Sequence, residues 1–231
     1  MDEKVLKKIE AGREYRDLLL ETRAEEEDKE DDFTVHEYAS TYNEEYSLYT
    51  MKYDDGYTVE VREKVEPHAF DNTDMSDVIM QYDHTGRVFA RKSNRTLSID
   101  EKDPRGLYIE AYLGGTEIGR QLYEEIKGGY TRKMSFGFTV NDDTFEQVES
   151  RKDGEVWLRT IKAIGKLYDV SAVSLPANDF TSISARHACE GVLADVEAER
   201  TKRANEEAER LLKEERRREI ESRLKALKGG N

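Results

Sequence analysis

Residues 116–138 read TEIGRQLYEEIKGGYTRKMSFGF, and the hydrophobic period changes within this stretch. Its first part places three apolar residues four positions apart, follows a threonine suited to an N-cap and stops at two glycines, which predicts a helix. Its last part, MSFGF, alternates, so Ser135 and Gly137 share one face of a strand and the bulky side chains take the other. A helix directly before a strand indicates an α+β fold.

Short strands continue on both sides of this stretch. β-type runs alternate with Gly, Pro, Asn and Asp at short intervals, as expected of an antiparallel barrel or sandwich. The expected strands are FTVHEYAS, GYTVEVREKVE, DVIMQYDH, RVFARKS, TLSIDEK, GLYIEAYL, KMSFGFTV, EVWLRTI and DVSAVSL. About 150 residues are enough for an independent core. The sequence therefore predicts one domain over residues 33–186.

The two ends have a different composition. Residues 3–27 lack proline and mix charged with apolar residues, which favours a helix, and the acidic run Glu25–Asp32 is typical of a linker. We therefore expect residues 1–32 to be a charged extension. The run from Gly191 to Leu227 is rich in Ala, Glu, Arg, Lys and Leu, so residues 187–231 are expected to form a charged helical tail. A solvated helix and a partner-binding helix explain this tail equally well.

Charge and hydropathy exclude several classes of function. The chain of 231 residues has a net charge of -14 and a mean hydropathy of -0.88. Residues 33–186 hold 27 acidic and 19 basic side chains, which argues against a nucleic-acid groove. No run approaches the roughly 18 apolar residues of a membrane span, and the acidic N-terminus does not have the order of a signal peptide. We expect a soluble, intracellular protein with neither a nucleic-acid nor a membrane partner.

Cysteine and histidine usage disfavours metal catalysis. Cys189 is the only cysteine, which excludes a disulfide within the chain and a multi-cysteine zinc site. No two of the four histidines have the short helical spacing of a zinc protease.

Three residues have types and positions suited to nucleophilic catalysis. His84 ends an apolar run just before a turn, where a base can reach a neighbouring strand. Ser135 lies beside Gly137, which leaves space for a substrate carbonyl. Asp169 precedes the apolar run Val170–Leu175 and is placed to orient a histidine. Taken singly, each also fits an ordinary role as a turn histidine, a strand serine or a strand-end acid.

Four longer motifs connect these residues to one family. They are MQYDHTGRVFAR, RGLYIEAYL, GRQLYEEIKGGYTRKMSFGF and KLYDVSAVSLPAN, and SISAR closes the series. Together they resemble the caudoviral prohead protease family of tailed bacteriophages, which is distantly similar to the herpesvirus assemblins. The resemblance covers about Val35 to Arg186. Its most specific part combines the helix, the glycine turn and MSFGF with the later acid, Val-Ser and Pro-Ala.

The resemblance implies a fold and a set of roles. The fold would be a mostly antiparallel β-barrel with flanking helices. His84 matches the family's histidine, Ser135 its nucleophile and Asp169 the third, acidic member. Two departures stand out, since Thr85 follows the histidine where an acid is frequent, and assemblins use a second histidine in the third role. His36, on another expected strand, is the obvious substitute in that case.

The implied function is that of a serine endopeptidase working through an acyl-enzyme. It would cleave the scaffold, or a scaffold-like segment of the major capsid protein, and itself, inside the procapsid in the host cytoplasm. The resemblance implies no cofactor, and analogy with assemblins suggests a homodimer. Backbone N–H groups around Ser135 or near the Asp169 strand, aided by Arg132, are candidate oxyanion donors. The alternative is a catalytically inactive scaffolding or capsid-interaction protein. A small esterase is disfavoured because Ser135 lacks a Gly-x-Ser-x-Gly elbow.

Overall fold

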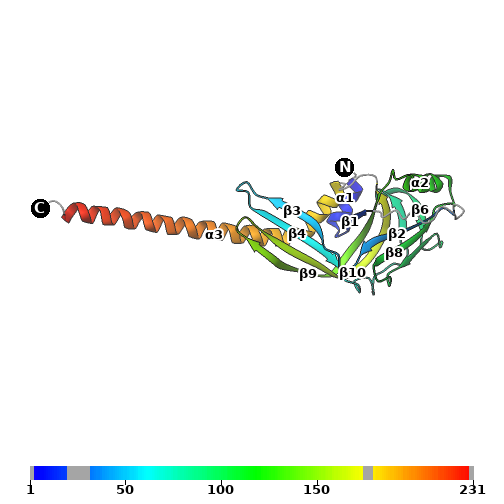
Figure 1. The fold of residues 1–231 in the computed structure, drawn as a ribbon, viewed down its shortest axis with the longest axis horizontal. Helices are drawn as coiled ribbons and strands as arrows, with labels where there is room; N and C mark the ends of the chain where they lie inside the picture. Colours follow the sequence, from blue (N-terminus) through cyan, green and yellow to red (C-terminus); the bar gives the residue numbers. More distant parts are fainter. Residues whose placement is uncertain (1–2, 20–31, 174–178, 229–231) are drawn as a thin grey trace. The chain divides into compact units, whose positions relative to one another are not determined.

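The computed structural model describes residues 3–19, 32–173 and 179–228 (Figure 1). The chain divides into two compact units, Met1–Cys189 and Glu190–Asn231. The first contains all of the described strands, the helices α1 (Glu3–Glu10) and α2 (Glu117–Lys127), and the start of α3 (Asp179–Lys228). Of the expected linker Glu25–Asp32, only Asp32 lies within the described residues. The LPAN residues of the fourth motif lie outside them.

The main sheet is built around one long hairpin. Its seven strands are β1 (Glu14–Leu19), β3 (Tyr46–Lys52), β4 (Thr58–Val65), β5 (Ile79–Tyr82), β6 (Thr85–Arg91), β9 (Lys133–Arg151) and β10 (Gly154–Val173). The hairpin consists of β9 and β10, and β1 pairs antiparallel with the other side of β9. On the far side of β10, β4 and β5 pair in parallel with its successive halves. β3 joins β4 and β6 joins β5, both antiparallel.

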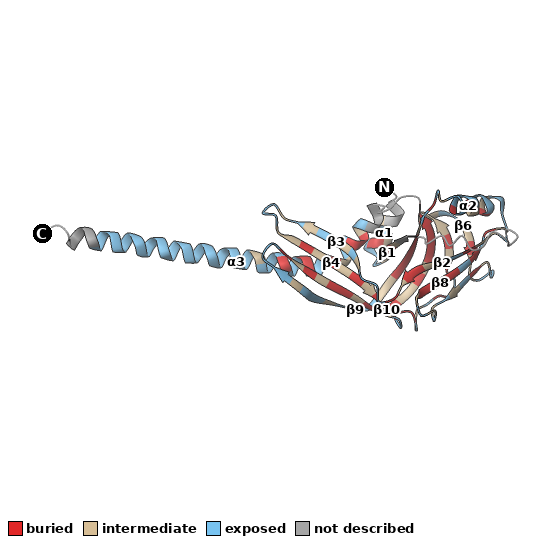
Figure 2. Cartoon of the chain, in the orientation of Figure 1, coloured by how far each residue is buried: buried red, intermediate tan, exposed pale blue. Residues whose placement is uncertain are grey.

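A second, three-stranded sheet completes the core. Its order is β2 (Thr34–Thr41), β8 (Gly106–Tyr112) and β7 (Leu97–Asp100), and both pairings are antiparallel. Apolar side chains from both sheets and from α2 form one buried cluster, visible as alternating buried positions along the strands in Figure 2. Met134, Phe136 and Phe138 belong to this cluster. Ser135 therefore lies on the opposite face of β9.

The α+β class is confirmed, but the expected barrel is not what the described strands form. Neither sheet closes on itself within the described residues, and the main sheet is mixed. Two of the strands, β5 and β7, are only four residues long. Within the described residues, hydrogen bonding does not continue around a ring, because each sheet ends in strands that are paired on one side only, which are β1, β3 and β6 in the main sheet and β2 and β7 in the second.

Of the helix expected over residues 3–27, the described residues 3–19 form only its first two turns, so the prediction is wrong for residues 11–19, and residues 20–27 lie outside the described part. Gly12 follows α1 with φ 86°, and Arg13 N–H bonds back to the carbonyl of Lys8, as in a Schellman end. The chain then extends as β1, which contains the fully buried Tyr15 and the nearly buried Arg16. The N-terminal segment is therefore part of the main sheet.

The other two helices agree with the sequence. α2 starts after Thr116, whose Oγ1 accepts from Gly119 N–H at 3.0 Å, and it ends at the glycine pair. α3 begins twelve residues before Gly191 and continues to Lys228. From Thr201 to Leu224 every residue of this helix is exposed. None of the described helices has an apolar stretch long enough to cross a membrane.

Candidate active site

Pairing within the main sheet brings distant parts of the chain to one place. In the β9–β10 ladder Ser135 lies opposite Ser171, and Gly137 lies opposite Asp169. On its other side Ser135 lies opposite Asp17 of β1. β5 runs parallel to the end of β10, so the turn that follows β5 reaches the same face.

His84 is held in an unusual turn between β5 and β6. Tyr82 pairs with Thr85, so the hairpin has two central residues, and both lie in the left-handed region, Asp83 at φ 51° and His84 at φ 56°. Two positive φ angles are the mark of a type I′ hairpin turn, where Asn, Asp and Gly are favoured. Non-glycine residues in this region carry strain and cluster at functional sites. The turn aims the imidazole at β9 and β10.

Three side chains form a continuous hydrogen-bonded chain at this point. His84 Nδ1 lies 2.5 Å from Asp169 Oδ1, and His84 Nε2 lies 2.6 Å from Ser135 Oγ. With Nδ1–H donating to the carboxylate, Nε2 accepts from the serine hydroxyl. This arrangement can remove the hydroxyl proton as Oγ attacks and can stabilise the imidazolium that results.

Further contacts keep Asp169 charged and fixed. Ser171 Oγ donates to Asp169 Oδ1 at 2.9 Å, and the Arg13 guanidinium lies 3.6 Å from Oδ2. Burial, the largest influence, raises the pKa of Asp169. The hydrogen bonds from His84 and Ser171, together with the charges of His84 and Arg13, outweigh it, so the pKa lies below its ordinary value. The carboxylate is therefore the stable form at neutral pH.

The site is closed to solvent. Ser135 is 0 % exposed, Asp169 1 % and His84 3 %. The ring of Tyr15 lies 4.4 Å from the imidazole, centroid to centroid. The space expected beside Gly137 is also filled, since a Cβ there would stand 2.6 Å from Asp169 Oδ2 and 2.9 Å from Tyr15 Cε1.

Two other sequence candidates lie elsewhere. His36 is on β2 of the second sheet, where its exposed ring contacts Tyr108 Oη at 3.0 Å and Glu110 at 3.5 Å. Arg132 is exposed, and its Nε donates to the carbonyl of Gly129 at 2.7 Å. Cys189 is buried, and burial raises the pKa of its thiol to about 12, so it is a poor nucleophile.

Sequence reasoning did not assign Ser171, Arg13 and Tyr15 to the site. Ser171 had a usable signal, because two positions after Asp169 on a strand is the same face. No sequence signal pointed to Arg13 and Tyr15, because a strand at the N-terminus was not expected. Within the described residues, no group of three or more His, Cys, Asp or Glu side chains could hold a metal ion.

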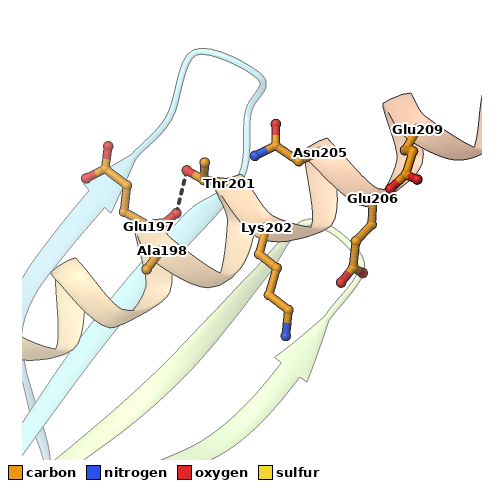
Figure 3. A pocket seen from close by; sticks show the side chains of 7 residues that line it. All are labelled: Glu197, Ala198, Thr201, Lys202, Asn205, Glu206 and Glu209. Carbon is orange, nitrogen blue, oxygen red and sulfur yellow. Dashed lines mark hydrogen bonds between the residues drawn. The ribbon is translucent and has the colours of Figure 1, made fainter. Parts of the chain in front are cut away.

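A hollow also lies along α3 in the second unit (Figure 3). It is lined by Glu197, Ala198, Thr201, Lys202, Asn205, Glu206 and Glu209. Its charged side chains face open solvent, and it contains no nucleophile paired with a base. The hollow is therefore not a candidate for a catalytic site.

Comparison with known proteins identifies a family. A family model described as caudovirus prohead serine protease matches residues 19–194, which include the histidine, serine and aspartate just described. Neither the curated proteins nor the solved structures contain a match to this chain. The matched part begins at the last residue of β1, so α1 and most of β1 lie outside it.

Proposed function

This chain belongs to the caudovirus prohead serine protease family, whose members are capsid maturation proteases, and on that premise we propose that Ser135 is its nucleophile. His84 acts as general base and then general acid, and Asp169 orients the histidine and stabilises its charged form. The observation that supports these roles is the chain of hydrogen bonds from Ser135 through His84 to Asp169.

The mechanism follows from the order of these contacts. Ser135 Oγ attacks the peptide carbonyl carbon while His84 Nε2 takes the hydroxyl proton, which gives a tetrahedral oxyanion. Collapse of this intermediate breaks the C–N bond, and the proton on Nε2 goes to the leaving amine. Water then attacks the acyl ester, with His84 again taking and returning the proton, and a carboxylic acid leaves. Asp169 stays ionised throughout.

The substrates follow from the same membership. We infer cleavage of the scaffold, or of a scaffold-like segment of the major capsid protein, and of the protease itself, inside the procapsid in the host cytoplasm. The family description, a prohead protease, supports this setting. A homodimer remains a proposal by analogy with assemblins.

We also keep the proposed division into an extension (1–32), a protease domain (33–186) and a tail (187–231). The compact unit that ends at Cys189 supports the second boundary. The pairing of β1 with β9 means that the extension contributes a strand to the sheet of the protease domain.

The decisive experiment labels the serine in assembled procapsids. Procapsids are formed with the wild-type chain, with Ser135→Ala or with Ser98→Ala, a matched change of an exposed serine on β7. A fluorophosphonate probe should label the wild-type and Ser98→Ala chains and leave Ser135→Ala unlabelled, and only the first two should cleave the scaffold. Normal scaffold cleavage by a folded Ser135→Ala chain would remove Ser135 from the mechanism. Absence of labelling and cleavage in all three would favour the inactive scaffolding protein.

A further inference from the structure

The proposed nucleophile cannot meet a substrate in the described conformation. A carbonyl carbon must come within about 3 to 3.5 Å of Ser135 Oγ before attack. Ser135 is 0 % exposed, and its general base is 3 % exposed. Some part of the chain must therefore move before any peptide is cleaved. The segment that covers Ser135 and His84 is the part that has to move.

The cover comes from the N-terminal segment, Glu3–Leu19. β1 is the outermost strand beside β9, with Asp17 opposite Ser135 and Tyr15 opposite Gly137. Residues opposite each other in an antiparallel pair place their side chains on the same face, so these two lie on the face of the serine. The Tyr15 ring packs against the imidazole, which leaves no room for a substrate there.

The same segment also contacts the third member of the site. Arg13 lies 3.6 Å from Asp169 Oδ2, and its guanidinium stacks over the Tyr168 ring at 3.5 Å from the centroid. Tyr15 N–H donates to Ser184 Oγ at 3.0 Å, on the first turns of α3. Ile9 of α1 packs with Tyr15 in a small buried cluster. Contacts with the rest of the first unit therefore hold the cover at Ile9, Arg13 and Tyr15.

β1 also occupies the edge where an extended peptide would bind. A peptide recognised by strand addition needs the free N–H and C=O groups of an outer strand. The outer side of β9 from Lys133 to Phe138 is already paired with β1. A substrate that added a strand at this edge would have to displace β1 from the backbone groups beside Ser135.

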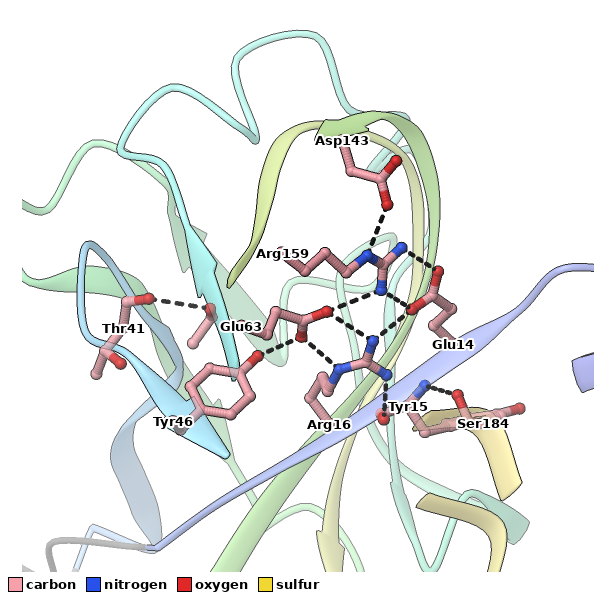
Figure 4. A network of polar contacts seen from close by, with 10 residues as sticks. Glu14, Tyr15, Arg16, Thr41, Tyr46, Glu63, Asp143, Arg159 and Ser184 are labelled. Atoms are coloured by element: carbon pink, nitrogen blue, oxygen red, sulfur yellow. Dashed lines mark hydrogen bonds and ion pairs between the residues drawn. The ribbon is translucent and has the colours of Figure 1, made fainter. Parts of the chain in front are cut away.

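A buried ion network holds β1 in this register (Figure 4). Arg16 of β1 binds Glu63 of β4 through two bonds, Nε to Oε1 at 2.5 Å and Nη2 to Oε2 at 2.9 Å. Glu14 of β1 binds Arg159 of β10 at 2.6 and 2.8 Å. Arg159 also binds Glu63 at 2.8 Å and Asp143 at 2.6 Å.

The charge pairing of this network suits a reversible contact. Glu14 and Arg16 also bind each other, and their charges cancel. Release of β1 therefore changes the net charge of neither β1 nor the rest of the network. Glu63 then keeps Arg159 and the Tyr46 hydroxyl, at 2.8 and 2.5 Å. Buried ion pairs give specific register more than net stability, because desolvation offsets much of their attraction.

We propose that the N-terminal segment is an intramolecular inhibitor: β1 occupies the β9 edge over Ser135, and its release from the Glu63–Arg159 pair opens the protease. This proposal rests on the proposed function of Ser135. The segment lies almost entirely outside the part of the chain that matches the family.

The test compares full-length chains that differ only in the latch, by which we mean the contacts that Glu14, Tyr15 and Arg16 of β1 make with the rest of the protein. Glu14→Gln with Arg16→Met removes the β1 side of the network without changing net charge. Tyr15→Ala leaves the network intact and removes the ring beside His84. The matched control is Asp77→Asn with Arg91→Met, which removes an exposed ion pair near β5 and β6. Fluorophosphonate labelling of Ser135 and hydrogen exchange of the Lys133–Phe138 amides are measured on each purified chain.

We expect both latch variants to label about tenfold faster than the wild type or more, because weakening the closed state raises the open population. The β9 amides should exchange faster in the double variant, and the control should behave as the wild type. If the wild type labels as fast as the variants, or the β9 amides of the double variant stay protected, the inhibitor proposal fails while Ser135 keeps its role. If Ser135 stays unlabelled in every chain and in procapsids, the proposed function fails as well.

Discussion

Gly137 lies directly opposite Asp169 in the β9–β10 ladder, and a Cβ atom at position 137 would stand 2.6 Å from Oδ2 of that carboxylate. It would also stand 2.9 Å from Tyr15 Cε1. Real Cβ atoms essentially never come this close to other heavy atoms, so one of these neighbours would have to shift. The glycine therefore sets the position of the carboxylate that holds His84.

Gly137→Ala should cost activity more than stability. Displacing Asp169 misaligns the imidazole, and a misplacement of about 1 Å can reduce turnover about a hundredfold. Overpacking of the site should lower the free energy of unfolding by about 1 to 3 kcal/mol. The rate of scaffold cleavage in procapsids and thermal melts measure the two effects. Gly191→Ala on α3, where a Cβ meets no atom within 4 Å, is the control and should leave cleavage unchanged.

Ser171→Ala tests the second support of Asp169. The lost bond, Ser171 Oγ to Asp169 Oδ1 at 2.9 Å, leaves the carboxylate with the His84 hydrogen bond alone once the N-terminal segment is released, so scaffold cleavage should slow by about tenfold, which is about 1.4 kcal/mol in barrier height. The NMR signal of the His84 Nδ1 proton should move, because its acceptor changes basicity. An unchanged proton signal with slower cleavage would make Ser171 merely structural.

The local parts of the fold could be predicted from the sequence. α2 has its cap at Thr116, its period and its glycine stop within one stretch, and all nine expected strands overlap strands of the structure. The positions of Ser135 on a strand and of His84 at a turn also follow from local patterns. Asp169 was expected at the start of a strand but lies within β10, because this one strand contains the expected strand EVWLRTI and the start of DVSAVSL. The assignment of all three as catalytic residues came from the family resemblance and stays a prediction.

The features that could not be predicted depend on contacts between residues far apart in the sequence. β1 reads EYRDLL, a mixture of charges, and its strand form depends on pairing with β9 and on burying Arg16 against Glu63. The parallel pairing of β4 and β5 with β10 joins segments about a hundred residues apart, which no local period reveals. β1 covers the site, so the burial of Ser135 and His84 could not be predicted from the sequence either.

Glu14 makes the latch sensitive to acid. Burial, the largest influence, raises its pKa, but the charges and hydrogen bonds of Arg16 and Arg159 outweigh it and lower the pKa from 4.5 to about 2. Between these two pH values the unfolded chain binds more protons than the folded chain, so the free energy of unfolding rises with pH. The contribution of Glu14 is complete above about pH 4.5 and is lost as the pH falls toward 2. This carboxylate accounts for at most about 3 kcal/mol.

The measurement is the free energy of urea unfolding at pH 7, 5 and 3. The wild type should lose more stability between pH 5 and 3 than Glu14→Gln does, whereas Glu146→Gln, an exposed carboxylate on β9, should follow the wild type. Equal acid losses in the wild type and Glu14→Gln would show that Glu14 is not held in its charged form by the network.

The third catalytic role is tested by comparing Asp169→Asn with His36→Gln. Asp169 contacts His84 Nδ1 at 2.5 Å, and loss of the acid in a well-studied triad costs about four orders of magnitude in turnover. Asn keeps the shape but favours the wrong histidine tautomer, so Asp169→Asn should nearly abolish scaffold cleavage and keep most of the thermal stability. His36 lies on the other sheet against Tyr108, so His36→Gln should stay within about tenfold of wild type. Near-normal cleavage by Asp169→Asn, together with collapse in His36→Gln, would transfer the third role to His36 and leave Asp169 as a structural acid of β10.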